Sequence, residues 1–237
     1  MARAPDLSVV IPAFNEEGRL PETLGKLGPH LERRSKSFEL ILVDDGSADG
    51  TLHVMREASE RRSHVKVVAL PGNRGKGRAL AMGVAASSGR FVLISDADLS
   101  TPIEELSKLE AALADGADVA IASRAKRGAR IEISQPPHRV LMGKVFNLIV
   151  QALLLPGLWD TQCGFKLFKG DLGRELFGQL KTDGFGYDVE VLYRARRGHH
   201  SIAEVPVRWQ HSAPTRVATF KSSLDMLKDV VRIRLGL

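Results

Sequence analysis

The first half of the chain alternates short apolar, β-rich runs with stretches of helical character, and this alternation constrains the fold most. Strands are expected at 7–11, 38–43, 65–70, 91–95 and 119–122. Helices are expected between them at 16–32, 51–63, 78–86 and 102–113. Strands that alternate with helices favour a Rossmann-like α/β fold with a mostly parallel central sheet flanked by helices.

The second half of the chain is less regular. Residues 125–137 are polar, basic and rich in proline, so we expect a mobile loop, followed by a strongly apolar stretch at 140–155. Further helices are expected at 171–180, 187–197 and 220–235, and a strand at 201–209. A chain of 237 residues suits one large α/β domain. We therefore expect a single domain over 1–237, with a basic loop plus an amphipathic or apolar helix at 125–160 and a C-terminal helical extension at 210–237.

Polar residues stand within a few positions after each of the five expected strands. They are Asn15, Asp44, Asn73, Asp96 and Arg124. In open α/β sheets, ligands bind at the carboxyl ends of the strands, so these positions predict a site along one edge of the sheet. The alternative is that these loops are polar only because loops lie at the surface.

The pair Asp96 and Asp98 is the strongest candidate for metal binding. In extended backbone, residues two apart point the same way, so both carboxylates would converge on one spot. Such a pair is costly unless a cation or a proton lies between them. Mg²⁺ takes oxygen ligands and shares its coordination shell with substrate phosphates, which favours a diphosphate substrate. The alternative is two solvated loop carboxylates that cap a helix.

Two further loops have residues suited to a nucleotide. Asp44 and Asp45 end the second expected strand, and we expect one of them to contact the ligand; turn formation and helix capping are the alternative. The loop 73–77 combines two glycines with Arg74 and Lys76, which suits a diphosphate near a helix N-terminus. Its spacing differs from that of a Walker A loop.

The charge balance and the single cysteine limit the class of protein. A net charge of +6 and a pI near 9.6 favour anionic partners without choosing among them. Cys163 is the only cysteine, which excludes an intrachain disulfide and suits a reducing compartment; we expect it to be a small core residue. The N-terminus lacks an apolar signal core, and no run of about 20 apolar residues could span a membrane. We expect a cytoplasmic protein.

The segment 140–159 is a candidate for contact with a membrane surface. Lys144, Asn147 and Gln151 would share one face of a helix whose other faces are apolar. Such a helix could lie in a bilayer interface, with the basic residues upstream of it on anionic headgroups at the inner face of the membrane. An ordinary buried helix and a homodimer interface are the alternatives.

Six motifs in a fixed order resemble glycosyltransferase family 2, which has the GT-A fold. They read VVIPAFNEE, ILVDDGSADGT, NRGKGRALAMG, ISDADLSTP, IASR and DTQCGFKLF. Within that family the chain is most similar to the dolichyl- and polyprenyl-phosphate sugar synthases, especially the dolichyl-phosphate β-glucosyltransferase branch. The resemblance covers residues 7–209.

The resemblance implies roles for individual residues. Pro12, Phe14 and Glu16, with Asp44 or Asp45, would line the nucleoside pocket. Lys76 would bind there or at the diphosphate, and the Asp96-Ala97-Asp98 segment would hold the donor. Asp98 would bind the metal, with Asp96 acting directly or through water and ribose. Arg124 and Arg139 would bind phosphate, and Asp160 matches a carboxylate proposed as the base in related enzymes. Ser100 stands where mannosyl-transferring relatives have a metal-binding Gln, which leaves a third protein ligand in doubt.

The resemblance also implies an activity. The chain would be an inverting, metal-dependent enzyme using Mg²⁺ or Mn²⁺ that moves a hexose, with UDP-glucose and a polyprenyl or dolichyl phosphate as the favoured donor and acceptor. A soluble acceptor or a GDP-mannose donor is an alternative within the family. A haloacid-dehalogenase-type phosphatase and a sugar-nucleotide nucleotidyltransferase are alternatives of other classes. A nucleic-acid partner is not expected, because aromatic residues make up 5% and no nucleic-acid-binding module is present.

Overall fold

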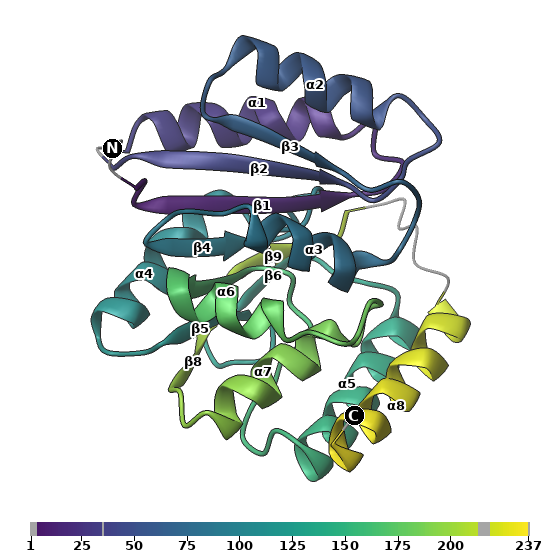
Figure 1. Cartoon of the computed structure of the whole chain (residues 1–237). Helices are drawn as coiled ribbons and strands as arrows, with labels where there is room; N and C mark the ends of the chain where they lie inside the picture. Colours follow the sequence, from purple (N-terminus) through teal and green to yellow (C-terminus); the bar gives the residue numbers. More distant parts are fainter. Residues whose placement is uncertain (1–3, 35, 213–218, 237) are drawn as a thin grey trace.

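A computed structural model describes residues 4–34, 36–212 and 219–236. Its centre is a seven-stranded sheet in the order β3-β2-β1-β4-β7-β5-β8 (Figure 1). The strands are β1 (Leu7–Ala13), β2 (Phe38–Asp44), β3 (Val65–Ala69), β4 (Phe91–Ile94), β5 (Val119–Ser123), β7 (Lys166–Lys169) and β8 (Ile202–Pro206). The α/β fold with a mostly parallel sheet is therefore confirmed.

Helices cover both faces of this sheet, which explains why its central strands β1 and β2 are buried along nearly their whole length. One face packs against α1 (Leu20–Glu32), α2 (Thr51–Arg61), the 3-10 turn η1 (Ile103–Glu105) and α4 (Leu106–Ala114). The other packs against α3 (Lys76–Ala85), α5 (Pro137–Leu153), α6 (Gly170–Gly178), α7 (Tyr187–Arg197) and α8 (Thr219–Leu235). Residues of α5 contact α8, and the two helices lie side by side (Figure 1).

The strand order places a ligand crevice at β1. The chain moves outward from β1 to β2 and β3, then returns to β4 on the other side of β1. Loops that follow strands on the two sides of such a switch point separate and leave a crevice. The loops after β1, β2 and β4 therefore meet at one edge of the sheet.

Strand β7 was not expected from the sequence, and it is the one strand that runs against its neighbours. It pairs antiparallel with both β4 and β5, with Lys166 opposite Ile94 and Ile121. Because β7 is reversed, its N-terminal end lies at the edge where β4 and β5 have their carboxyl ends. The preceding segment 160–164 is thereby brought to the crevice.

Three other expectations need correction. The expected strand 201–209 is divided at Val207 into β8 and β9 (Arg208–Gln210), which belong to different sheets. The expected loop 125–137 contains an exposed strand, β6 (Arg130–Ile133), which pairs parallel with β9. The helix expected within 140–159, with Pro156-Gly157 as its end, begins earlier, at Pro137, and ends at Leu153, after which Leu154 and Leu155 are buried.

The expected polar face of α5 is only partly exposed. Asn147 turns inward, where its amide donates to the Leu158 carbonyl at 3.2 Å. The exposed side chains include Leu141, Val145 and Leu148, whose exposed fractions are 64%, 51% and 66%. Among the described helices, none has the length and hydropathy needed to cross a bilayer. The expected extension at 210–237 includes 213–218, which lie outside the described residues, and its helical part is α8.

Candidate active site

The loops after β1 and β2 are held together by side-chain hydrogen bonds. Asn15 has a left-handed backbone, with φ +56°, and its amide donates to Ser47 Oγ at 2.9 Å. In return, the amide of Ala48 donates to Asn15 Oδ1 at 2.8 Å. A non-glycine residue with positive φ persists only where surrounding contacts fix it, and such positions concentrate at functional sites. This pairing sets the shape of the predicted nucleoside pocket.

The residues predicted for that pocket differ in exposure. Pro12 is buried within β1, while Phe14 at its end is 37% exposed. Glu16 is half-buried and forms an ion pair with Arg19 at 2.7 Å. Asp44 is buried, and its carboxylate accepts from the Ser47 amide at 3.2 Å. Phe14 and Glu16 therefore have the accessible side chains here.

Asp45 holds the glycine-rich loop in place. Its carboxylate accepts from the amides of Arg74 and Gly75, at 2.8 and 3.0 Å. Burial raises the pKa of Asp45, and these two donors oppose that shift. Gly75 has φ +100°, and a Cβ there would meet the Asp183 carbonyl at 2.5 Å. A glycine is required at this turn, which delivers Lys76 to the first position of α3.

Lys76 and Asp96 join two of the predicted motifs. Lys76 Nζ lies 2.5 Å from Asp96 Oδ1 and 5.7 Å from the ring centroid of Tyr187. Burial opposes ionisation of Asp96, but the charge and hydrogen bond of Lys76 outweigh it and lower the pKa of Asp96. The loops after β3 and β4 therefore form one charged centre.

Asp98 differs from Asp96 in its surroundings. Its Oδ1 accepts from the Ser100 amide at 2.9 Å. Burial raises the pKa of Asp98, and the neighbouring charge of Asp96 raises it further. Between them, the carbonyl of Ala97 accepts a hydrogen bond from the Thr23 hydroxyl of α1, and the next residue, Leu99, has φ +46°. The backbone at 97–99 is thus fixed from α1.

This donor set fits a hard divalent cation. Asp96 and Asp98 supply carboxylate oxygens, and a bound cation would offset the burial and the neighbouring Asp96 charge that raise the pKa of Asp98. Over the ranges that the structure describes, no three His, Cys, Asp or Glu side chains converge as a metal site. Mg²⁺ and Mn²⁺ would therefore take their remaining ligands from substrate oxygens or water, as Mg²⁺ commonly does.

A second charged pair lies at the neighbouring strand ends. Arg124 follows β5, and its Nε and Nη2 donate to the two oxygens of Asp160 at 2.7 and 2.8 Å. The Arg124 amide also donates to Asp160. Burial opposes ionisation of Asp160, but the Arg124 charge and hydrogen bonds outweigh it and lower its pKa. Asp160 is thus an ionised carboxylate that orients Arg124, and bidentate pairing fixes that guanidinium well.

Arg139 and Cys163 were also singled out from the sequence. Arg139 is half-buried in the first turn of α5. Cys163 is buried beside the Thr101 hydroxyl, with 3.5 Å between Sγ and Oγ1, and burial raises the pKa of its thiol. A protonated, buried thiol is a poor nucleophile and packs as a small core residue.

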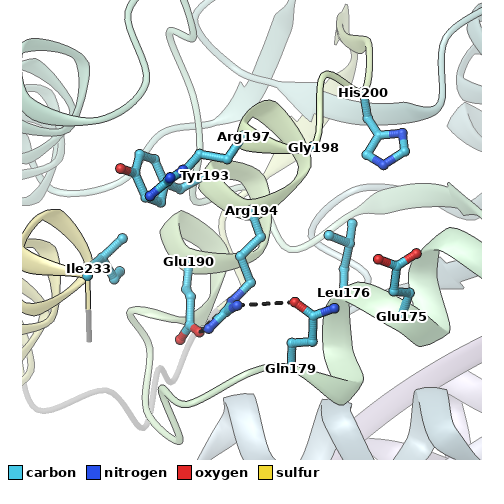
Figure 2. Close-up of a pocket in the computed structure, with 11 residues that line it drawn as sticks. Glu175, Leu176, Gln179, Glu190, Tyr193, Arg194, Arg197, Gly198, His200 and Ile233 are labelled. Atoms are coloured by element: carbon cyan, nitrogen blue, oxygen red, sulfur yellow. Dashed lines mark hydrogen bonds and ion pairs between the residues drawn. The ribbon is translucent and has the colours of Figure 1, made fainter.

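Two of the cavities lined by described residues are relevant here. One of about 540 Å³ borders Asp98 and is lined also by Glu16, Thr23 and Gln210. The other, of about 330 Å³, lies between α6, α7 and α8 and is lined by Glu190, Arg194 and Arg197 among others (Figure 2). Arg194, which lines this second cavity, is already bonded to Glu190 and Gln179. The first cavity is the one that adjoins the candidate metal site.

Sequence reasoning missed four residues beneath the site: Gly164, Lys166, Tyr187 and Asp188. A Cβ at Gly164 would lie 2.1 Å from Asp96 Oδ2, so the carboxylate rests on this glycine. Lys166 and Asp188 form a buried ion pair. Gly164 and Lys166 belong to the motif DTQCGFKLF, which could have drawn attention to them, whereas Tyr187 and Asp188 stand in an ordinary amphipathic helix.

Comparison with known proteins identifies the family to which the chain is similar. The sequence model described as "Glycosyl transferase family 2" matches residues 8–177. A dolichyl-phosphate beta-glucosyltransferase of Homo sapiens is 37% identical over 97% of this chain and 75% of its own length. The protein of the same description from Dictyostelium discoideum is 35% identical over 96% of this chain and 73% of its own length.

Solved structures agree on the fold. Glucosyl-3-phosphoglycerate synthase from Mycobacterium tuberculosis, in complex with Mn²⁺, uridine diphosphate and glucosyl-3-phosphoglycerate, has a TM-score of 0.73 at 23% identity. The alignment covers 98% of this chain and 81% of that one. At this identity the likeness establishes the fold alone.

The contact between Gly164 and Asp96 yields a test of the site. We expect Gly164→Ala to displace the Asp96 carboxylate and to lower activity about 100-fold, the order of loss that a 1 Å misplacement causes. The melting temperature should change little, because the site lies at the sheet edge. Gly25→Ala, on an open surface of α1 with nothing within 4 Å of its Cβ, is the matched control. Wild-type activity in Gly164→Ala would contradict this role of Asp96.

Proposed function

The chain belongs to glycosyl transferase family 2, and on that premise we propose that it transfers glucose from UDP-glucose to a polyprenyl or dolichyl phosphate. Inversion at the anomeric carbon and dependence on Mg²⁺ or Mn²⁺ are part of the proposal. The named relatives support glucose and the lipid phosphate. The structural neighbours solved with Mn²⁺ and uridine-diphosphate-glucose support the donor and the cation.

One observation carries the proposal: two charged centres stand at the ends of β4 and β5, which are separated only by β7. In the first centre, Lys76 from the loop after β3 meets Asp96 and Asp98 from the loop after β4. Arg124 and Asp160 lie at the end of β5. A donor diphosphate and an acceptor phosphate each need such a charged centre, and transfer needs the two close together.

In the proposed mechanism, Phe14 and Glu16 line the nucleoside pocket with Pro12 and Asp44, and Lys76 binds the donor diphosphate. A divalent cation held by Asp98, with Asp96 beside it, would neutralise charge on the diphosphate as it leaves. Asp45 acts indirectly, by holding the loop that carries Lys76.

Arg124 and Arg139 bind the acceptor phosphate. One phosphate oxygen attacks the anomeric carbon from the face opposite the diphosphate, the bond from that carbon to the diphosphate oxygen breaks, and UDP departs. A phosphate monoester has a second pKa of about 6, so it is already anionic at neutral pH. The acceptor needs no strong base, and Asp160 orients Arg124.

The alternatives keep unequal support. A GDP-mannose donor and a soluble acceptor are the alternatives within the same family. The assay below distinguishes each of them from the proposed substrates. The haloacid-dehalogenase-type phosphatase and the nucleotidyltransferase have no support from the family assignment. In addition, Asp96 follows β4. The phosphatase motif belongs instead to the first strand.

Peripheral contact with the inner face of the membrane is also part of the proposal. Exposed Leu141, Val145 and Leu148 of α5 lie beside exposed Lys144. Apolar side chains flanked by cations favour an anionic bilayer surface. Trp159 is also exposed, at 57%, and directly precedes the buried Asp160. A lipid that contacts both α5 and Trp159 would have its phosphate near Arg124.

The transfer reaction tests the function. Purified protein with UDP-glucose, polyprenyl phosphate and Mn²⁺ is expected to form the glucosyl lipid, and GDP-mannose is expected to be a poor donor. Asp98→Asn should lower the rate by about 100-fold or more, because charge stabilisation at the leaving group is lost. Asp115→Asn, an exposed carboxylate, is the control. Equal rates with and without the metal, or a preference for another donor or a soluble acceptor, would contradict the proposal.

Asp160→Asn separates an orienting role from a base. The pKa of Asp160 is lowered, so the carboxylate stays ionised at neutral pH. Its pairing with Arg124 is lost only as the pH falls below the range in which an aspartate ordinarily takes up a proton. We expect kcat/KM for the acceptor to fall by about 10- to 100-fold through a higher KM, with an unchanged pH profile between pH 6 and 8, roughly. Asp171→Asn breaks an exposed Asp–Arg pair and is the control. A loss confined to kcat, with a new pH dependence, would indicate a base.

Co-sedimentation with vesicles tests the membrane contact. Leu148→Ser should weaken binding to vesicles containing anionic lipid by about tenfold, since it removes one buried leucine. Met82→Ser, at an exposed apolar residue of α3, should have no effect. Failure of the wild type to bind anionic vesicles would remove this part of the proposal, and a dimer dissociated by Leu148→Ser would assign the face to self-association.

A further inference from the structure

Lys166 is a charged residue in the centre of the sheet. It opens β7, its side chain is 1% exposed, and its backbone lies opposite Ile94 of β4 and Ile121 of β5. Buried lysines are rare unless they are paired. None of the roles described above uses this residue.

The ammonium group of Lys166 has two partners. It donates to the Cys163 carbonyl at 2.5 Å and forms an ion pair with the carboxylate of Asp188 in the first turn of α7. Asp188 provides the counter-charge that stabilises the buried ammonium. The Cys163 contact is different in kind, because it fixes the backbone of the turn before β7.

That turn supports Asp96. Gly164 follows Cys163, and the Asp96 carboxylate lies so close to it that a Cβ would be 2.1 Å from Oδ2. A continuous set of contacts therefore runs from Asp188 through Lys166 and the Cys163 carbonyl to Gly164 and Asp96. A shift of the turn would move the surface on which Asp96 rests.

A buried ion pair is by itself weak evidence for a stabilising role. Replacing a buried ion pair by apolar side chains of similar volume is often neutral or stabilising, because desolvation of the two charges is costly. Phe168, two residues along β7, is fully buried against the same helical layer as Tyr187, so apolar side chains are accommodated there. The pair therefore has a role other than packing.

We propose that Lys166 is a positioning residue, which holds the Cys163–Gly164 turn against Asp96 and so sets the geometry at which the site binds its cation and nucleotide diphosphate. The proposal rests on the proposed function for the nature of the ligand. Lys166 acts through the backbone turn and does not touch the substrate.

The double variant Lys166→Met with Asp188→Leu tests it, because it removes both charges without leaving one unpaired. We expect a melting temperature equal to or above that of the wild type. Titration of Mn²⁺ in the presence of UDP, followed by electron paramagnetic resonance and by calorimetry, should show affinity lower by about 10- to 100-fold, as for loss of outer-shell partners. The donor KM should rise while the acceptor KM is unchanged. Wild-type Mn²⁺·UDP affinity in the folded variant would overturn the proposal.

Two further variants make the test specific. Lys169→Met breaks a more exposed lysine–aspartate pair of the same strand and should leave Mn²⁺·UDP affinity unchanged. Gly164→Ala in the background of the double variant should cost much less than it does alone, because both changes act on one contact. Full additivity would contradict the proposed route. If the apolar double variant does not fold, the titration is repeated with Lys166→Gln and Asp188→Asn, which keep neutral polar side chains. Glutamine is shorter than lysine, so it withdraws the donor from the Cys163 carbonyl.

The readout separates this inference from the proposed function. If the wild type binds no Mn²⁺·UDP, the proposed donor and cation are wrong. If the wild type binds and the folded double variant binds equally, the proposed function stands and the role of Lys166 is wrong.

Discussion

The reversed direction of β7 is the constraint on which the candidate site depends. In a wholly parallel sheet, the segment before a strand enters at the edge opposite the ligand crevice. Because β7 runs antiparallel between β4 and β5, residues 160–164 arrive at the same edge as Asp96 and Arg124. Asp160 then pairs with Arg124, and Gly164 supports Asp96. This one reversal therefore completes the second charged centre and supports the first.

Strands β1 to β5 and the loops that follow them were predictable, because each has a largely apolar run that is followed by a polar residue. Strand β7 was not, since its four residues KLFK include two lysines and have no apolar run. Its first lysine is buried only because Asp188, distant in sequence, supplies the counter-charge. The division at Val207 was missed for a similar reason: β8 and β9 read as one run, and only pairing with β5 and β6 separates them.

The site residues show the same limit. Sequence order identified Asp96, Asp98, Lys76, Arg124 and Asp160 as polar positions in motifs, and the resemblance assigned their roles. Their partners were not predictable: Asp45 holds the backbone of the glycine-rich loop, and Asp160 has both oxygens on Arg124. These contacts depend on the distance between loops that join different strands. They divide the aspartates into those available to a ligand and those that position a neighbour.

The central claim is that a nucleotide diphosphate and a divalent cation occupy the crevice between Lys76 and Asp98. A crystal structure of the chain with UDP and Mn²⁺ tests it most directly. The account predicts Mn²⁺ bound by Asp98 and diphosphate oxygens, with Lys76 on the diphosphate and the uracil nucleoside against Phe14. UDP bound elsewhere, such as in the cavity between α6, α7 and α8, or bound in the crevice with Asp98 facing no cation, would contradict it.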